Sequence, residues 1–158
     1  MYTEELIELL LKNKSSRKVF CGVIPLDQIP LGKRINKECS FIVNTHESNK
    51  PGEHWFAIYV PKRGPIEYFD SYGLPPYHEI IYKFFNVNKR NFIHNKIKLQ
   101  HNSSKNCGKF TLFYIYYRSK GYTMKEYLKL FNTKYLNYND YILNNLFTRI
   151  NSIVSKSK

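Results

Sequence analysis

The chain has 158 residues, of which 42% are hydrophobic and 16% are aromatic, and this composition predicts one globular domain over residues 1–158. It carries 25 Lys and Arg against 12 Asp and Glu, and the resulting net charge of +13 favours a polyanionic partner. Three widely spaced cysteines exclude a disulfide framework and a cysteine-rich zinc site, and no apolar run approaches the roughly 18 residues of a membrane span. The first residues lack the basic-then-apolar order of a signal peptide, so we expect an intracellular monomer that does not bind membranes.

The positive charge comes mainly from lysine, with 19 Lys against 6 Arg. The chain is also rich in Asn, Ile, Tyr and Phe, and AT-rich coding sequence favours all of these residues. Proteins that read bases combine Arg side chains with stacking aromatic residues on one surface, and the sequence shows no such cluster. We therefore expect non-specific, salt-sensitive attachment to DNA rather than dedicated sequence recognition.

In chain order, apolar spacing predicts a helix over residues 3–11, a polar loop over 12–19 and an extended segment that contains Pro25 and Pro30. Short apolar runs predict four strands, at residues 39–44, 54–60, 66–70 and 96–100. A polar loop is expected over residues 45–53. Helical periodicity predicts four further helices, at residues 77–86, 107–120, 124–131 and 140–154. This order predicts an α+β fold, in which helices flank a small mixed, largely antiparallel sheet.

Cys107 is the candidate nucleophile, because it opens a predicted helix. Apolar residues recur at helical spacing after it, at Phe110, Phe113, Tyr114 and Tyr117, and give this helix a buried face. The N–H groups at a helix N-terminus favour anions, so a thiolate at this place would be stabilised. The alternative is a small packing residue, which is the usual role of a free cysteine.

His54 is the candidate base, and Asp70 is the acid that would orient its ring. His54 opens a predicted strand, and Asp70 ends the neighbouring strand of the same hairpin sixteen residues later. Pairing of these strands can bring the carboxylate beside the imidazole and stabilise the charged ring. Glu67 is the alternative acid, but strand alternation places it on the opposite face from Asp70. A plain strand-end histidine and a turn aspartate are the alternatives to these two roles.

The remaining polar candidates carry less weight. The amide of Gln100, seven positions before Cys107, could donate to an oxyanion together with the backbone N–H of Cys107. No strand pair that could supply a carboxylate lies beside the other histidines, which are His46, His78, His94 and His101. The two other cysteines open no long helix, so we expect packing roles for Cys21 and Cys39.

The stretches GEHWFAIYV, YFDSYG and QHNSSKNCG together resemble the adenovirus-type cysteine protease (adenain) family, which belongs with the Ulp/SENP deSUMOylating proteases in a broader clan. The order His, acid, Gln, Cys is that of the clan. Six residues separate Gln100 from Cys107, as in adenain, whereas Ulp-type enzymes usually have five and an Asp where this chain has Asn106. The upstream GVIPLDQIP and FIVNT are similar to adenain-like proteases of viruses, virophages and large DNA transposons. The resemblance spans about residues 20–120.

The resemblance implies that Cys107 is the nucleophile at the N-terminus of a central helix, that His54 is the general base and that Asp70 orients it. It also implies that Gln100 is an oxyanion donor and that Trp55 packs where small residues before the scissile bond are held, as in Gly-Gly or Gly-Ala type sequences. Such an enzyme needs no metal or organic cofactor. The adenovirus enzyme is stimulated by DNA and by a disulfide-linked peptide. No cysteine between Asp70 and Gln100 could take such a peptide, so only the stimulation by DNA carries over.

The resemblance therefore implies a thiol endopeptidase whose protein substrates are capsid or precursor proteins of a virus or mobile element. We expect it in the host cytoplasm or nucleus, or packaged in a virion. One alternative is an isopeptidase that uses the same site on a ubiquitin-like modifier such as SUMO. Another is a non-catalytic, basic nucleic-acid-binding module that keeps the fold, and a third is an acetyltransferase of the same clan.

Overall fold

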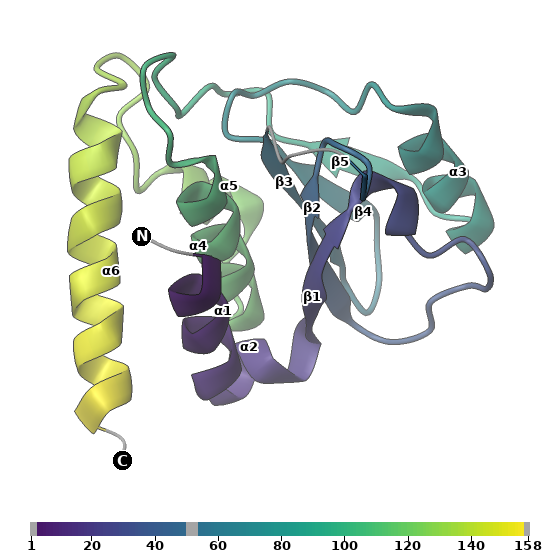
Figure 1. Ribbon diagram of the computed structural model, residues 1–158, viewed down its shortest axis with the longest axis horizontal. Helices are drawn as coiled ribbons and strands as arrows, with labels where there is room; N and C mark the ends of the chain where they lie inside the picture. The colour runs from purple at the N-terminus through teal and green to yellow at the C-terminus, as the bar shows by residue number, and fades with distance from the viewer. Residues whose placement is uncertain (1–2, 50–53, 157–158) are drawn as a thin grey trace.

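The computed structural model describes residues 3–49 and 54–156, and it confirms the predicted α+β class. A five-stranded sheet lies between helices in the described residues (Figure 1). The strands follow chain order across the sheet: β1 (Phe20–Pro25), β2 (Cys39–Asn44), β3 (Trp55–Val60), β4 (Ile66–Phe69) and β5 (Phe92–His94). The two central pairs, β2–β3 and β3–β4, are antiparallel, whereas β1–β2 and β4–β5 are parallel. The sheet is therefore mixed as expected, but it is not largely antiparallel, because two of its four pairings are parallel.

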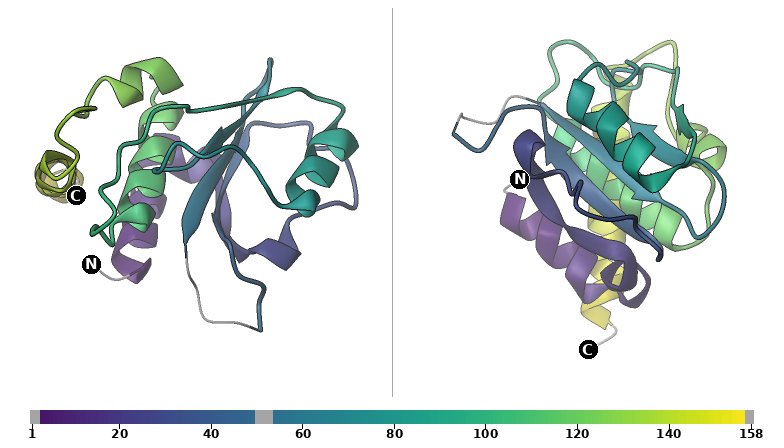
Figure 2. Two further views of the ribbon diagram at one scale, coloured as in Figure 1. Left: turned by 90° about the horizontal axis from the view of Figure 1, so that it is seen from above. Right: turned by 90° about the vertical axis from the view of Figure 1, so that its right-hand side faces the viewer.

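The helices form two unequal layers. On one face of the sheet lies α3 (Glu79–Asn88), and the other face carries α1 (Thr3–Lys12), α2 (Lys14–Val19), α4 (Cys107–Ser119), α5 (Met124–Leu128) and α6 (Tyr138–Lys156) (Figures 1 and 2). A short 3₁₀ turn, η1 (Leu26–Gln28), follows β1. The central helix is α4, which packs on β3 and β2 and is flanked by α1, α2 and α5. In the described part of the chain, no helix combines the length and the apolar character that crossing a bilayer requires.

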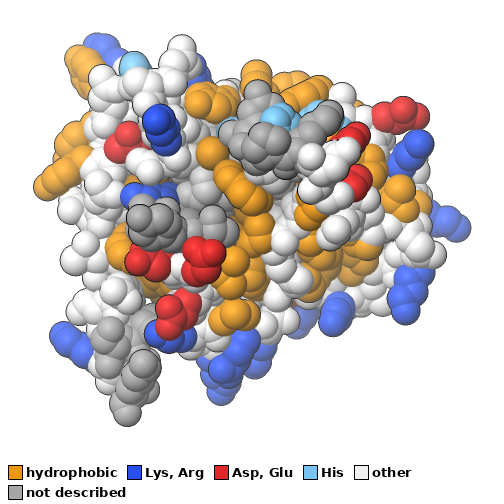
Figure 3. All heavy atoms as spheres, in the orientation of Figure 1, with side chains coloured by type: hydrophobic (Ala, Val, Ile, Leu, Met, Phe, Trp, Pro, Cys, Tyr) orange, Lys and Arg blue, Asp and Glu red, His pale blue; other side chains and the backbone are white. Residues whose placement is uncertain are grey.

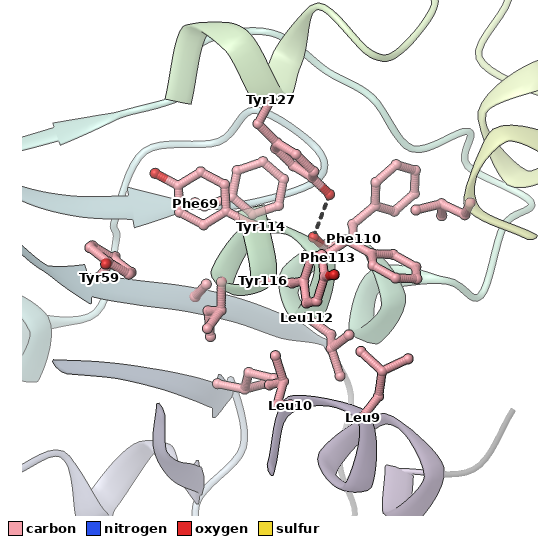
Figure 4. Packing of buried hydrophobic residues seen from close by; sticks show 14 of the residues in the cluster. Leu9, Leu10, Tyr59, Phe69, Phe110, Leu112, Phe113, Tyr114, Tyr116 and Tyr127 are labelled. Carbon is pink, nitrogen blue, oxygen red and sulfur yellow. Dashed lines mark hydrogen bonds between the residues drawn. The ribbon is translucent and has the colours of Figure 1, made fainter. Parts of the chain in front are cut away.

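Separate apolar cores lie on the two faces of the sheet. The larger core joins the sheet to α4, where Phe69 stacks on Tyr114 and the hydroxyl of Tyr127 donates to the carbonyl of Phe110 at 2.7 Å (Figure 4). Residues 110–116 of α4 are all buried, so the helix is covered on every side rather than on one face. Burying each large side chain contributes about 1.5–3 kcal/mol. This packing fixes the position of the first turn of α4.

Two predicted segments are wrong. The loop expected over residues 12–19 contains α2. The side chain of Asn13 caps the first turn of this helix, because its Oδ1 accepts from the N–H groups of Ser15 and Ser16 at 3.1 and 3.2 Å. The strand expected over residues 96–100 is absent from the described sheet, and β5 lies just before it instead.

The other boundaries differ by a few residues. Helix α3 lies two residues later than predicted at each end, α5 ends earlier, and α6 extends further at both ends. Residues 50–53 of the expected loop over 45–53 lie outside the described residues.

Candidate active site

A cavity of about 810 Å³ opens where the start of β3, the turn after β4 and the start of α4 meet. Among the predicted residues, it is lined by His54, Trp55, Gln100 and Cys107. Asp70 lies behind His54, with a side chain that is only 1% exposed. The other lining residues are Thr45, Tyr72, Leu74, Tyr77, Ser104, Lys105, Asn106, Gly108 and Lys109. All five side chains singled out from the sequence therefore converge on one place.

His54 is fixed by the sheet on one side and by a carboxylate on the other. Its carbonyl accepts from the N–H of Thr45 at 2.8 Å, which continues the β2–β3 ladder by one residue beyond β3. Its Nε2 lies 3.0 Å from Oδ2 of Asp70, and the ring of Tyr72 lies against the imidazole at 5.1 Å between centroids. Because Nε2 is used by Asp70, Nδ1 is the ring nitrogen left for the thiol of Cys107.

Two opposing effects act on the charge of His54. Burial lowers the pKa of His54, but the hydrogen bonds with the Asp70 carboxylate and the Cys107 thiol outweigh it and raise this pKa to about 9. The ring is therefore mostly protonated at neutral pH. A protonated ring can act as a general acid.

Asp70 is held by its main chain as well as by its carboxylate. Its Oδ1 accepts from the N–H of Tyr72 at 2.7 Å, which is the bond of a turn aspartate. In addition, the buried side chain of Asn95 accepts from the Asp70 N–H at 2.9 Å and donates to the Asp70 carbonyl at 2.5 Å. Sequence reasoning missed Asn95, because a single asparagine in a polar loop is typical of any turn. Its side chain fixes the acid in place.

Gln100 is buried, with 1% of its surface exposed. Its Oε1 accepts from the hydroxyl of Ser71 at 2.5 Å, and its Nε2 donates to the carbonyl of Ser104 at 2.8 Å. The backbone N–H groups of Leu99 and Gln100 both donate to the carbonyl of Ser71, at 2.8 and 3.0 Å. Residues 97–100 are therefore bound to the turn after β4 rather than to a strand.

Gly73 allows this close approach. Its φ of 74° lies in the left-handed region, and a Cβ there would stand 2.8 Å from the carbonyl carbon of Ile97. A side chain at this position would therefore push residues 97–100 away from the turn that carries Asp70.

Cys107 is half-buried and is the first residue of α4. The preceding Asn106 makes no side-chain cap, so the thiol lies at a helix N-terminus whose first N–H groups receive no side-chain oxygen from it. The N–H of Asn106 donates to the hydroxyl of Ser104 at 3.2 Å, and that hydroxyl donates to Oδ1 of Asp140 on α6 at 2.8 Å. The loop before the thiol is thus tied to a second helix.

The structure places the alternative candidates elsewhere. Glu67 binds Arg118 and Tyr114 on α4, so it is not the acid of this cavity. The cavity is not lined by any of the other histidines, His46, His78, His94 and His101.

The expected packing role holds for Cys39, which is buried, but is wrong for Cys21, which is exposed on β1. Within residues 3–49 and 54–156, no three His, Cys, Asp or Glu side chains gather in a way that could hold a metal ion.

Comparison with known proteins points to viral cysteine proteases. No family model matches the chain. A cysteine protease of African swine fever virus, from a Malawi tick isolate, is 36% identical over 98 residues, which cover 53% of this chain and 36% of the viral protein. The protein of a Kenyan pig isolate of the same virus, 35% identical over the same shares, is named a SUMO-1 cysteine protease.

The crystal structure of the African swine fever virus protease shares the fold. It aligns with a TM-score of 0.57 at 21% identity, and the alignment covers 87% of this chain and 64% of that one. The chain spans about a third of the length of the curated relatives that it matches.

Proposed function

We propose that the chain is a cysteine endopeptidase, in which Cys107 is the nucleophile, His54 the acid–base group and Asp70 the group that orients it. The observation that carries the proposal is the convergence of these residues and Gln100 on one cavity, with the imidazole bonded to a buried carboxylate. The names of the viral relatives support it. We also propose that the enzyme is of the adenovirus type, because of the order and spacing of the four residues.

The proposed reaction begins when the Cys107 thiolate attacks a peptide carbonyl. A carbon–sulfur bond forms, and the negative charge moves to the carbonyl oxygen, where Nε2 of Gln100 and the backbone N–H of Cys107 stabilise it. The carbon–nitrogen bond then breaks as the imidazolium of His54 gives its proton to the leaving amine. The neutral imidazole next takes a proton from water, whose oxygen attacks the thioester carbon; the carbon–sulfur bond breaks, which releases the acid product and restores the Cys107 thiolate beside the imidazolium.

We propose that the substrate is an extended protein segment with small residues before the scissile bond, such as Gly-Gly in capsid or precursor proteins. Trp55 and Tyr72 line the cavity beside His54, and large aromatic side chains there leave little room for a large residue. Leu74 and Tyr77 are 50% and 60% exposed on the same cavity and offer apolar contacts to the rest of an extended chain.

The test is cleavage of a Gly-Gly-containing peptide by the wild-type chain and by matched cysteine variants. Cys107→Ala should lose activity by about 10⁴-fold or more, since variants that lack a nucleophile keep only the contribution of binding and of the oxyanion donors. Cys21→Ala removes an exposed cysteine outside the cavity and should cleave as fast as the wild type. Equal rates for Cys107→Ala and the wild type would show that the assignment is wrong.

A second candidate is an isopeptidase acting on a ubiquitin-like modifier, which the name of one viral relative favours. Such a substrate presents the same chemistry, because the bond that is cut also follows small residues. Assays of a SUMO conjugate and of the Gly-Gly peptide at equal concentrations separate the two functions, and the larger kcat/KM identifies the function.

We further propose non-specific binding of DNA at the turn between β3 and β4. Five basic side chains surround a hollow of about 420 Å³ there, and they are Arg34, Lys37, Lys62, Arg63 and Arg90. Lys and Arg side chains gather along the lower and right-hand edges of the face in Figure 3, below the sheet and around α3. This hollow lies at the opposite end of the hairpin from His54 and Asp70, so bound DNA would leave the cavity open.

A further inference from the structure

We propose that Ser71 is a positioning residue for the oxyanion donor, because its hydroxyl fixes the amide of Gln100 with an N–H directed to the substrate. The inference rests on the proposed function of the cavity. It adds to that function a residue that touches neither the substrate nor the thiol.

The hydrogen bonds of Gln100 determine which way round its amide lies. A side-chain amide has one oxygen, which only accepts, and one nitrogen, which only donates. The carbonyl of Ser104 is an acceptor, so the amide atom 2.8 Å from it must be Nε2. The amide oxygen must then face Ser71, whose hydroxyl donates at 2.5 Å. The reversed amide would press two acceptor oxygens together at Ser104.

This orientation leaves one N–H for the reaction. Nε2 carries two hydrogens, and the Ser104 carbonyl takes one of them. Among the residues that the structure describes, the second hydrogen meets no acceptor, and Gln100 lines the cavity beside Cys107. An oxyanion formed at Cys107 supplies the missing acceptor. A donor that is already oriented stabilises the transition state without reorganisation during the reaction.

Ser71 is placed to hold the amide firmly. It is fully buried, and its carbonyl also accepts from the backbone N–H groups of Leu99 and Gln100, so it binds both the main chain and the side chain of Gln100. It directly follows Asp70, which is bonded to His54. One short turn therefore positions both the acid that orients the base and the donor that stabilises the oxyanion.

The kinetic test is Ser71→Ala on the Gly-Gly peptide. We expect kcat to fall at least about tenfold and at most about 10²–10³-fold, which is the loss on removing an oxyanion donor outright, with KM nearly unchanged. In a Gln100→Ala background, the same substitution should lower kcat no further, because the group through which Ser71 acts is already gone. An unchanged kcat for Ser71→Ala alone, or an equal further loss in the Gln100→Ala background, would overturn the proposal.

The matched control is Ser16→Ala. Ser16 is also fully buried and also donates a short hydrogen bond, to the carbonyl of Leu10 at 2.6 Å, but it lies on α2 outside the cavity. This variant should keep the wild-type kcat. A loss equal to that of Ser71→Ala would show that any buried serine has the same effect and would overturn the specific role of Ser71.

Alkylation of Cys107 by iodoacetamide distinguishes an effect of Ser71 on the oxyanion from an effect on the thiol. The sulfur displaces iodide at a saturated carbon, so no oxyanion forms and Gln100 has no part in the step. Cys107 of the Ser71→Ala variant should therefore be alkylated at the wild-type rate. A fall in this rate as large as the fall in kcat would place the effect of Ser71 on the thiol and would contradict the proposal.

A spectroscopic test stands even if the wild type cleaves no peptide, which would refute the proposed function alone. The sequence has two glutamines, so selective ¹⁵N-glutamine labelling gives two pairs of side-chain amide signals, with the exposed Gln28 as internal control. In the wild type, we expect a rigid amide at Gln100 and a mobile one at Gln28. In Ser71→Ala, the Gln100 signals should shift and broaden. Equal mobility of the two amides in the wild type, or unchanged Gln100 signals in the variant, would overturn the proposal.

Discussion

Two carboxylates on the same hairpin are buried within three residues of each other, and they meet different partners. Glu67 binds the guanidinium of Arg118 at 2.7 Å and accepts from the hydroxyl of Tyr114. Asp70 binds the imidazole of His54 at 3.0 Å. An arginine keeps its charge at every physiological pH, whereas a histidine gains and loses a proton. Burial of an acid is therefore no sign of function by itself, and the partner of the acid decides what it can do.

The two neighbourhoods also differ in what they border. Glu67 lies between the sheet and α4, where Arg118 packs over the ring of Tyr59 at 4.6 Å, and it does not line the cavity. Asp70 lies behind a cavity that holds a thiol and an amide donor. We therefore expect loss of Glu67 to lower stability and loss of Asp70 to lower activity.

Of the substitutions at the two carboxylates, Asp70→Asn should have the larger effect on catalysis. The amide can still bond to the ring but cannot stabilise its positive charge, so kcat should fall about 10²–10⁴-fold, the upper figure being that of the equivalent change in a serine protease. The unfolding free energy should change much less, since the shape is kept. Comparing kcat on a Gly-Gly peptide with the thermal midpoint of the same sample measures both. If Asp70→Asn kept the wild-type kcat, Asp70 would have no part in catalysis.

Glu67→Gln should show the opposite pattern. It leaves the Arg118 charge half-buried without a counter-charge, and breaking a buried pair in this way costs about 3–5 kcal/mol of stability. Folded enzyme should keep a kcat near that of the wild type. Denaturant unfolding of the variant measures the cost.

The double variant Glu67→Leu/Arg118→Met is the control for Glu67→Gln. It removes both charges and should recover much of the lost stability, because replacing a buried ion pair by apolar residues is often neutral. If Glu67→Gln lost activity as fully as Asp70→Asn, the separation of the two neighbourhoods would be wrong.

The raised pKa of His54 predicts how the rate depends on pH. The leaving amine needs a proton from the imidazolium, so kcat/KM, which reports the free enzyme, should fall as the pH rises through about 9. Asp70 is one of the groups that raise this pKa, so in Asp70→Asn the fall should occur at lower pH. The charged ring also contributes to the free energy of unfolding. This contribution is complete below the ordinary histidine pKa of 6.5 and is lost as the pH rises through about 9. Rate profiles of both proteins between pH 6 and 10 test this, and coincident profiles would contradict it.

The sequence predicts the parts of the site that depend on local pattern. The apolar run after His54 and the periodic aromatic residues after Cys107 place both groups at the ends of elements, and the hairpin brings Asp70 to His54. The spacing of Gln100 from Cys107 carries weight only together with the family resemblance. Asn95 and Ser71 could not be found, because their roles are hydrogen bonds across 25 and 29 residues.

The prediction of a strand over residues 96–100 is wrong for the same reason, which is a contact with residues far away in the sequence. Its sequence, KIKLQ, alternates as a strand does, but two successive N–H groups, those of Leu99 and Gln100, donate to the single carbonyl of Ser71. In a strand, successive N–H groups point to opposite sides, so this pattern cannot be part of a sheet ladder. The tertiary contact with the turn after β4 determines this segment, and nothing in its own residues shows that contact.

The turn between β3 and β4 extends the comparison to a third region, where charges are exposed rather than buried. Arg63 is exposed beside the basic hollow, so removing it should weaken DNA binding only through one phosphate contact. Arg63→Ala should reduce the slope of log K against log salt by about 1 and should leave kcat unchanged. Lys125→Ala, an exposed charge on α5, is the matched control and should keep the wild-type slope. Binding that stays equally tight between about 50 and 200 mM salt would contradict a phosphate-driven mode, because each contact releases counterions.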